Sequence, residues 1–105
     1  MKKHEHYIER NDLKGATHLQ VSVYYTKGGA NYLSGGTTSR GFYLSVRPVT
    51  KREGSLSFDL FSGRKKFLFE TARYTDKQFG RAVKMASVFE DQLIADVAAE
   101  NKAAA

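Results

Sequence analysis

Apolar and polar residues alternate along four stretches of this chain, and a helical spacing follows them. In the first stretch, 19–26, every second position is Leu, Val or Tyr, and the positions between are mostly polar. The stretches 42–47, 56–61 and 66–71 repeat this period of two, which is typical of strands with one buried face. The strands follow one another through connections that predict an antiparallel meander.

The spacing changes from two to between three and four after residue 75. Thr75 and Gln78 stand three residues apart, as in a capping box, and Asp76 suits the positive end of a helix dipole. Apolar residues then recur at helical spacing: Phe79, Ala82, Val83, Ala86, Phe89, Leu93, Ile94 and Val97. The pattern predicts one long amphipathic helix over 75–101.

Together these elements predict a single α+β domain over residues 1–105. A four-stranded antiparallel meander sheet over 19–71 is followed by one long C-terminal amphipathic helix, and a chain of 105 residues suffices for one such core. Residues 1–17 are polar and are predicted as an N-terminal arm or an irregular cover for one end of the core. Pro48, the only proline, is expected to end the regular pairing of the second strand.

The period of two divides the predicted sheet into two faces. The face toward the helix is expected to carry these apolar residues: Leu19, Val21, Val23, Phe42, Leu44, Val46, Leu56, Phe58, Leu60, Phe67 and Phe69. The second face is expected to mix aromatic, hydroxyl and charged residues: Ser22, Tyr24, Tyr43, Ser45, Arg47, Ser57, Asp59, Phe61, Lys66 and Leu68. Such a face suits single-stranded nucleic acid, because bases stack on rings while Lys and Arg neutralise phosphates. Two alternatives stay open: a second subunit packs on this face, or the N-terminal segment covers it.

The charge distribution favours a nucleic-acid partner. The net charge is +6, and residues 40–84 hold eleven basic and four acidic residues, a net +7, whereas 85–105 hold one and four, a net −3. Clustered positive charge is the electrostatic signature of nucleic-acid binding, although a solvated basic surface explains +6 equally well. The predicted contacts are Tyr24, Tyr43 and Phe61 for bases, and Arg47, Arg64, Lys65 and Lys66 for phosphates.

Segment 27–41 holds five of the nine glycines. It does not match a phosphate-binding loop, because its glycines lead into a strand where that loop requires a helix. The simplest interpretation is a flexible hairpin tip. The functional interpretation is a finger whose Asn31, Tyr32 and Arg40 contact a nucleic acid or a protein partner.

Several classes of function lack support in the sequence. The chain has no cysteine, and the run His4-Glu5-His6 has no defined third and fourth ligand for zinc. No nucleophile elbow or paired-carboxylate signature is present, so we expect no catalytic residue, no cofactor, no metal and no enzymatic activity. No apolar run reaches about 18 residues and no signal-peptide pattern follows the first residues, which leads us to expect a cytoplasmic protein with no membrane partner.

Four antiparallel strands and a long helix over 19–100, with a basic and aromatic sheet, resemble the single-stranded nucleic-acid-binding domains of the Whirly, Pur-alpha and transcriptional-coactivator type. The resemblance implies a homodimer assembled partly through the helices, with strands curving around single-stranded DNA or RNA. It implies contacts from Tyr24, Tyr43, Arg47, Phe61 and Lys66, while the long glycine-rich first hairpin departs from those families.

Segments 27–32 and 40–46 also look like small accessory proteins of bacterial conjugative elements and phages. That setting suits a single-strand binder. It equally suits the alternative function, a protein-interaction module that acts on a host factor or defence protein through the glycine-rich segment 27–41.

Overall fold

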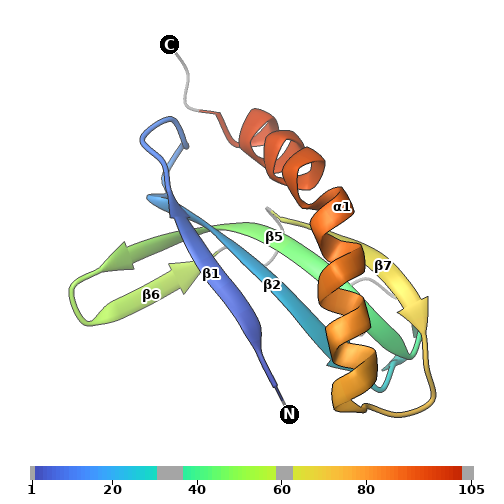
Figure 1. Cartoon of the computed structure of the whole chain (residues 1–105). Helices are drawn as coiled ribbons and strands as arrows, with labels where there is room; N and C mark the ends of the chain where they lie inside the picture. The colour runs from blue at the N-terminus through green and yellow to red at the C-terminus, as the bar shows by residue number, and fades with distance from the viewer. Residues whose placement is uncertain (1, 31–36, 59–62, 103–105) are drawn as a thin grey trace.

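The alternating stretches pair into one antiparallel sheet, and the C-terminal helix lies across one of its faces (Figure 1). The computed structural model describes residues 2–30, 37–58 and 63–102. The elements are β1 (His4–Glu9), β2 (His18–Thr26), β3 (Gly29–Ala30), β4 (Thr37–Thr38), β5 (Gly41–Arg52), β6 (Ser55–Phe58), β7 (Arg64–Glu70) and α1 (Asp76–Glu100). The predicted α+β class, an antiparallel sheet followed by one C-terminal helix, is confirmed.

β5 is the central strand of a five-stranded sheet. β2 pairs with it along 41–49 and is paired in turn with β1, while β7 pairs with β5 along 41–46 and β6 pairs along 49–52. The predicted meander order is therefore wrong, because β6 and β7 both pair with β5. β5 has twelve residues, which is long enough for β7 to pair with its first half and β6 with its last residues. The expectation that Pro48 ends the regular pairing is wrong: β5 continues through Pro48, which pairs with Leu19 of β2 and lies between the parts of β5 paired with β7 and β6.

Part of the expected N-terminal arm is an edge strand. β1 pairs antiparallel with β2, with His6 opposite Val21 and Ile8 opposite Leu19. Three residues of β1, His4, His6 and Ile8, share a face with the buried residues of β2. Because two of them are histidines, the sequence of β1 shows no row of alternating apolar residues. The segment widens the sheet and does not cover its second face.

A β-bulge in β7 reverses the orientation of the residues that precede it. Phe42 pairs with Phe69, but Tyr43 pairs with Phe67, which leaves Leu68 as the extra residue. Leu68 is buried in the core and Phe69 packs against it, so two consecutive side chains of β7 lie on the helix side. Phe67 consequently lies with Tyr43 on the face away from α1, opposite to its expected side.

Alternation along β7 separates three basic residues that are consecutive in the sequence, and the bulge sets the side on which each lies. The Lys65 Nζ lies 5.4 Å from the ring centroid of Tyr43, on the face away from the helix. The Lys66 Nζ lies 4.4 Å from the ring centroid of Phe89 in α1, and Arg64 makes ion pairs with two carboxylates of the helix. Lys66 was expected on the second face, and the register shift is the physical reason that it is not there.

The core lies between the sheet and α1, with Phe42 at its centre. The Phe42 ring is fully buried, with centroids 5.3 Å from those of Tyr25 and Phe69 and 6.3 Å from that of Phe79. The other buried members of this cluster are Leu13, Leu19, Val21, Val23, Leu44, Val46, Leu68, Ala82, Ala86, Val97 and Ala98. One face of the sheet is thus taken up by the helix.

The helix begins where the capping pattern predicts. The Thr75 hydroxyl accepts a hydrogen bond from the N–H of Gln78 at 3.1 Å, and α1 starts at the next residue after the cap. At its other end the N–H of Lys14, between β1 and β2, donates to the carbonyl oxygen of Asn101 at 2.8 Å. Over the described residues, no helix has the length and apolar character needed to cross a bilayer.

Candidate nucleic-acid interface

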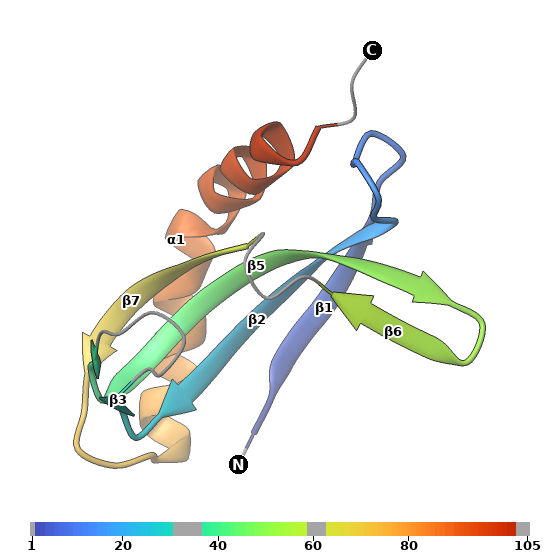
Figure 2. The same cartoon turned by 180° about the vertical axis from the view of Figure 1, so that it is seen from behind.

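The face away from α1 carries a row of three aromatic rings on neighbouring strands. Figure 2 views the sheet from this side, with β2, β5 and β7 side by side and α1 behind them. Tyr24 and Tyr43 are direct partners, with ring centroids 5.7 Å apart and planes 16° apart, and Tyr43 and Phe67 have centroids 5.1 Å apart. We refer to Tyr24, Tyr43 and Phe67 as the aromatic row, and to this side of the sheet as the open face.

The three rings of the aromatic row differ in exposure. Tyr43 is only 6% exposed, and its hydroxyl donates to the carbonyl oxygen of Ser39 at 3.0 Å. Tyr24 is half-buried, and this burial raises the pKa of its hydroxyl above the ordinary value. Phe67 is 41% exposed. Tyr43 therefore supports the row from its middle, while Phe67 and part of Tyr24 present ring surface to a ligand.

Two of the predicted phosphate contacts lie on the open face. Lys65 stands over the middle ring of the aromatic row, and Arg47 lies on β5 next to β2. Arg64 and Lys66 lie on the helix side and do not join them. The alternation along β7 thus divides the predicted basic cluster between two surfaces, and the bulge decides which residues face which side.

A chain of hydrogen bonds on the open face crosses β1, β2 and β5. The Tyr7 hydroxyl and the Gln20 Nε2 both donate to the Oε1 of Glu5 at 2.7 Å. The Nε of Arg47 donates to the Gln20 Oε1. The hydrogen bond from Tyr7 is the main cause that lowers the pKa of Glu5, with Gln20 and Arg47 acting in the same direction. The network orients the guanidinium of Arg47.

A shallow hollow of about 330 Å³ adjoins the aromatic row. It is lined by Lys3, His4, Glu5, Ser22, Val23, Tyr24, Ser45 and Arg47. Ser22 and Ser45 are direct partners on β2 and β5, so their hydroxyls lie close together. The two hydroxyls are hydrogen-bond donors, and the positive charges of Lys3 and Arg47 are offset in part by the carboxylate of Glu5, which lines the same hollow.

The sequence did not predict Phe67, Lys3, Glu5 and Tyr7 as part of this face. Phe67 was assigned to the other side because no residue in β7 announces a bulge. The remaining three belong to β1 or precede it. The signal in the sequence is a period of two in which Glu5 and Tyr7 share one face and His6 and Ile8 share the other. It is weak because both faces include polar residues.

The other predicted contacts are placed as follows. Phe61, Asn31 and Tyr32 lie outside the described residues. Arg40 is exposed just before β5, and its Nε donates to the carbonyl oxygen of Lys27 at 3.2 Å. It therefore lies at the end of the sheet and away from the hollow lined by Arg47.

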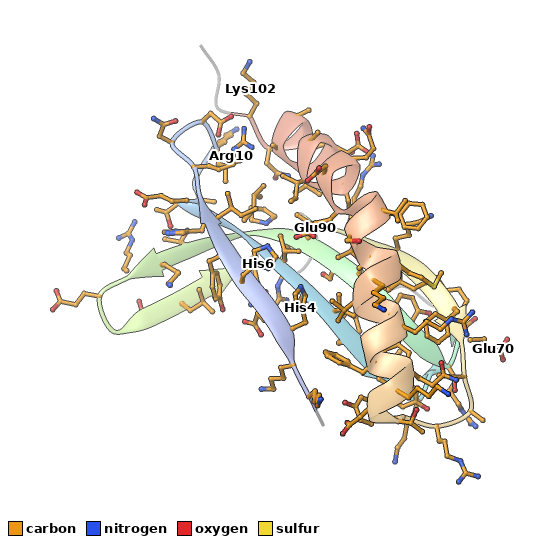
Figure 3. All side chains as sticks on the ribbon, in the orientation of Figure 1. His4, His6, Arg10, Glu70, Glu90 and Lys102 are labelled. Carbon is orange, nitrogen blue, oxygen red and sulfur yellow. The ribbon has the colours of Figure 1, made fainter. Side chains whose placement is uncertain are left out.

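The histidines of β1 link this strand to the helix. The His6 Nε2 lies 3.0 Å from the Oε1 of Glu90, and Figure 3 shows the two side chains pointing toward one another. His4 and His6 meet edge to face with centroids 5.7 Å apart. In the ranges that the structure describes, no three His, Cys, Asp or Glu side chains gather closely enough to hold a metal ion.

Comparisons with known proteins leave the chain without a match: no family model, curated protein or solved structure matches it. The resemblance to the Whirly, Pur-alpha and transcriptional-coactivator domains, and to accessory proteins of mobile elements, stays a prediction.

Proposed function

We propose that this protein binds single-stranded nucleic acid on the open face, with little sequence preference. The observation that supports this most directly is the aromatic row, with Lys65 over its middle ring and the hollow of Arg47 and Lys3 beside it. Rings stack with any base and cations neutralise any phosphate, so this combination requires no base-specific hydrogen bond.

The spacing of the row suits two bases. Phe67 and Tyr24 lie on strands separated by β5, about 10 Å apart at the usual distance between strands. One base stacks on the exposed ring of Phe67 and a second on the accessible part of Tyr24. The backbone between them passes Lys65, and the next phosphate reaches the hollow near Arg47.

A single strand is expected to bind more tightly than a duplex. Stacking on a protein ring requires a free base face, which a paired and stacked base does not offer. Fluorescence anisotropy with a labelled strand of about 16 nucleotides and a matched duplex, at low and moderate salt, tests this directly. Salt-sensitive binding that favours the strand is the expected result, and no binding at low salt by the folded protein would overturn the proposal.

Two phenylalanines on opposite sides of the sheet provide a matched pair of variants. Phe67 is 41% exposed on the open face, and Phe89 is 36% exposed on α1. Phe67→Ala is expected to weaken binding about 5- to 150-fold, because stacking of one base contributes about 1–3 kcal/mol. Phe89→Ala removes an equally large side chain and is expected to leave affinity unchanged. Equal effects of both variants would exclude the aromatic row as the binding site.

Self-association is the competing use of the open face. The predicted homodimer is tested by analytical ultracentrifugation across the same salt series as the binding measurements. Nucleic-acid affinity falls steeply with salt, whereas contact between apolar rings changes little. If Phe67→Ala dissociates a dimer and leaves nucleic-acid binding intact, the open face is an interface between copies. The alternative module over 27–41 has one predicted contact, Arg40, among the described residues, and no observation favours it.

A further inference from the structure

We propose that a second hollow, at the end of the sheet, binds a phosphate monoester such as the terminal phosphate of a nucleic-acid strand. The hollow measures about 320 Å³ and is lined by Tyr25, Lys27, Arg40, Ala72, Arg73 and Tyr74. It lies where β2 ends, β5 begins and β7 connects to α1. We call it the end hollow. This site extends the proposed function. It rests on that function where the phosphate belongs to the end of a nucleic-acid strand bound on the open face.

The charge lining the end hollow is entirely positive. Lys27, Arg40 and Arg73 line it together with no carboxylate, and none of the three makes an ion pair within the described ranges. A phosphate monoester carries about −1.5 to −2 charges at neutral pH, more than the single charge of a phosphodiester. Three cationic residues around one hollow therefore match a strand end better than a phosphate within the strand.

Backbone contacts hold the cationic segments in place. The Nε of Arg40 donates to the Lys27 carbonyl oxygen at 3.2 Å, and the Thr71 N–H donates to the Arg40 carbonyl oxygen at 3.3 Å. The two terminal nitrogens of the Arg40 guanidinium make no hydrogen bond within the described part of the chain. A guanidinium held on one edge presents its other donors to two phosphate oxygens at once.

Two tyrosines give the end hollow an aromatic wall. The rings of Tyr25 and Tyr74 have centroids 6.1 Å apart and planes 65° apart. The Tyr74 hydroxyl accepts from the backbone N–H of Lys2 at 2.9 Å and donates to Asp76 at 3.0 Å, which fixes the ring. A nucleoside attached to the phosphate thus meets ring surface beside the cations.

The end hollow lies past the ends of the strands, on the helix side of the sheet where Tyr25 packs on Phe42, and a short length of chain separates it from the aromatic row. Tyr24 precedes Lys27 by three residues and Tyr43 follows Arg40 by three, which corresponds to about 10 Å of extended chain. A strand stacked on the row and continuing over the ends of β2 and β5 therefore brings its terminal phosphate to the three cations.

Terminal phosphorylation of one oligonucleotide tests this site. Three versions of the same strand, with a 5′-phosphate, a 3′-phosphate or neither, are titrated against the full chain. One terminal phosphate is expected to tighten binding about tenfold, the effect of one additional charge-assisted hydrogen bond. Arg73→Gln is expected to remove this gain. Arg52→Gln, at the far end of β5, removes the same charge and is expected to keep it. Equal affinity of the three strands, or a gain that survives Arg73→Gln, would overturn the proposal.

A second arm separates this site from the aromatic row. A nucleoside 5′-monophosphate and the corresponding nucleoside are titrated separately into nitrogen-labelled protein, and the amide shifts of Lys27, Arg40 and Arg73 are followed by NMR. Shifts caused by the monophosphate and not by the nucleoside support the end hollow, even if no strand binds the aromatic row. Strand binding without these shifts overturns the end hollow and leaves the function of the open face standing.

Discussion

Lys65 and Lys66 allow a charge-matched test of which side of the sheet binds nucleic acid. They are adjacent in the chain, but the Lys65 Nζ lies 5.4 Å from the Tyr43 centroid on the open face, and the Lys66 Nζ lies 4.4 Å from the Phe89 centroid on the helix side. Replacing either lysine by glutamine removes one positive charge and one cation–π contact. The two variants therefore have the same composition and net charge, and differ only in the side that has lost the cation.

The expected magnitude follows from the loss of one phosphate contact. Each phosphate neutralised on a single strand contributes about 0.7 to the slope of log affinity against log salt, so one lost contact costs about fivefold in affinity at about 0.1 M salt. Lys65→Gln is expected to lower the slope and the affinity by these amounts. Lys66→Gln acts only through the screened field of its charge, and its effect on affinity is expected to stay below about twofold.

The assay is an anisotropy titration of both variants and the unaltered protein between about 0.05 and 0.3 M salt. Thermal unfolding serves as the control, because each variant loses a cation–π contact of about 0.5–1 kcal/mol and the two should be destabilised alike. Equal slopes for the two variants would mean that binding follows total charge, and the face assignment would be refuted. A larger loss for Lys66→Gln would place the ligand on the helix side.

Three further substitutions test the fold that supports the open face. The Tyr7 hydroxyl lowers the pKa of Glu5 below its ordinary value of 4.5, so the stabilisation is present at neutral pH and is lost as the pH falls through the folded-state pKa. Glu5→Gln should therefore reduce the free energy of unfolding in urea by about 0.5 kcal/mol at neutral pH and less in acid, and a deficit that persists in acid would contradict this. Thr75→Ala should destabilise by about 1 kcal/mol in calorimetry, and failure of Thr75→Ser to restore most of it would exclude capping as the cause. Gly41→Ala places a Cβ against the Phe69 carbonyl oxygen and should cost more than about 2 kcal/mol in urea unfolding, whereas an unchanged midpoint would argue against this β5–β7 register.

Local periodicity was sufficient to predict α1 and the two central strands. The cap at Thr75 and the helical spacing that follows act within a few residues of each other, so no distant contact is needed to define them. In β2 and β5 the alternation is regular, and Val21 and Leu44 are fully buried on the predicted face. Strands with partners on both edges keep a constant orientation, which makes their faces readable from sequence.

The strand β1 and the orientation of the side chains in β7 could not be predicted, because tertiary contacts decide them. In β1 the inward positions include His6, which pairs with Glu90 of α1, a partner that only the folded chain brings near. In β7 the run Phe67-Leu68-Phe69 is apolar throughout, so the sequence fits either register. Packing of Leu68 in the core selects one of them. Tyr24 and Arg47 therefore lie on the open face as predicted, whereas the register of β7 places Lys65 there and leaves Arg64 and Lys66 on the helix side.

The bulge at Leu68 shifts the register of β7, and the register decides which side chains of β7 lie on each side of the sheet. A substitution in β7 alters one side of the sheet and leaves the other as it was. If β7 paired with β5 without the bulge, the two sets of side chains would exchange, placing Lys66 opposite Ser45 on the open face and Lys65 opposite Val46 on the helix side, with the charge of the run unaltered. Point changes therefore alter the two surfaces independently, whereas a change of register couples them.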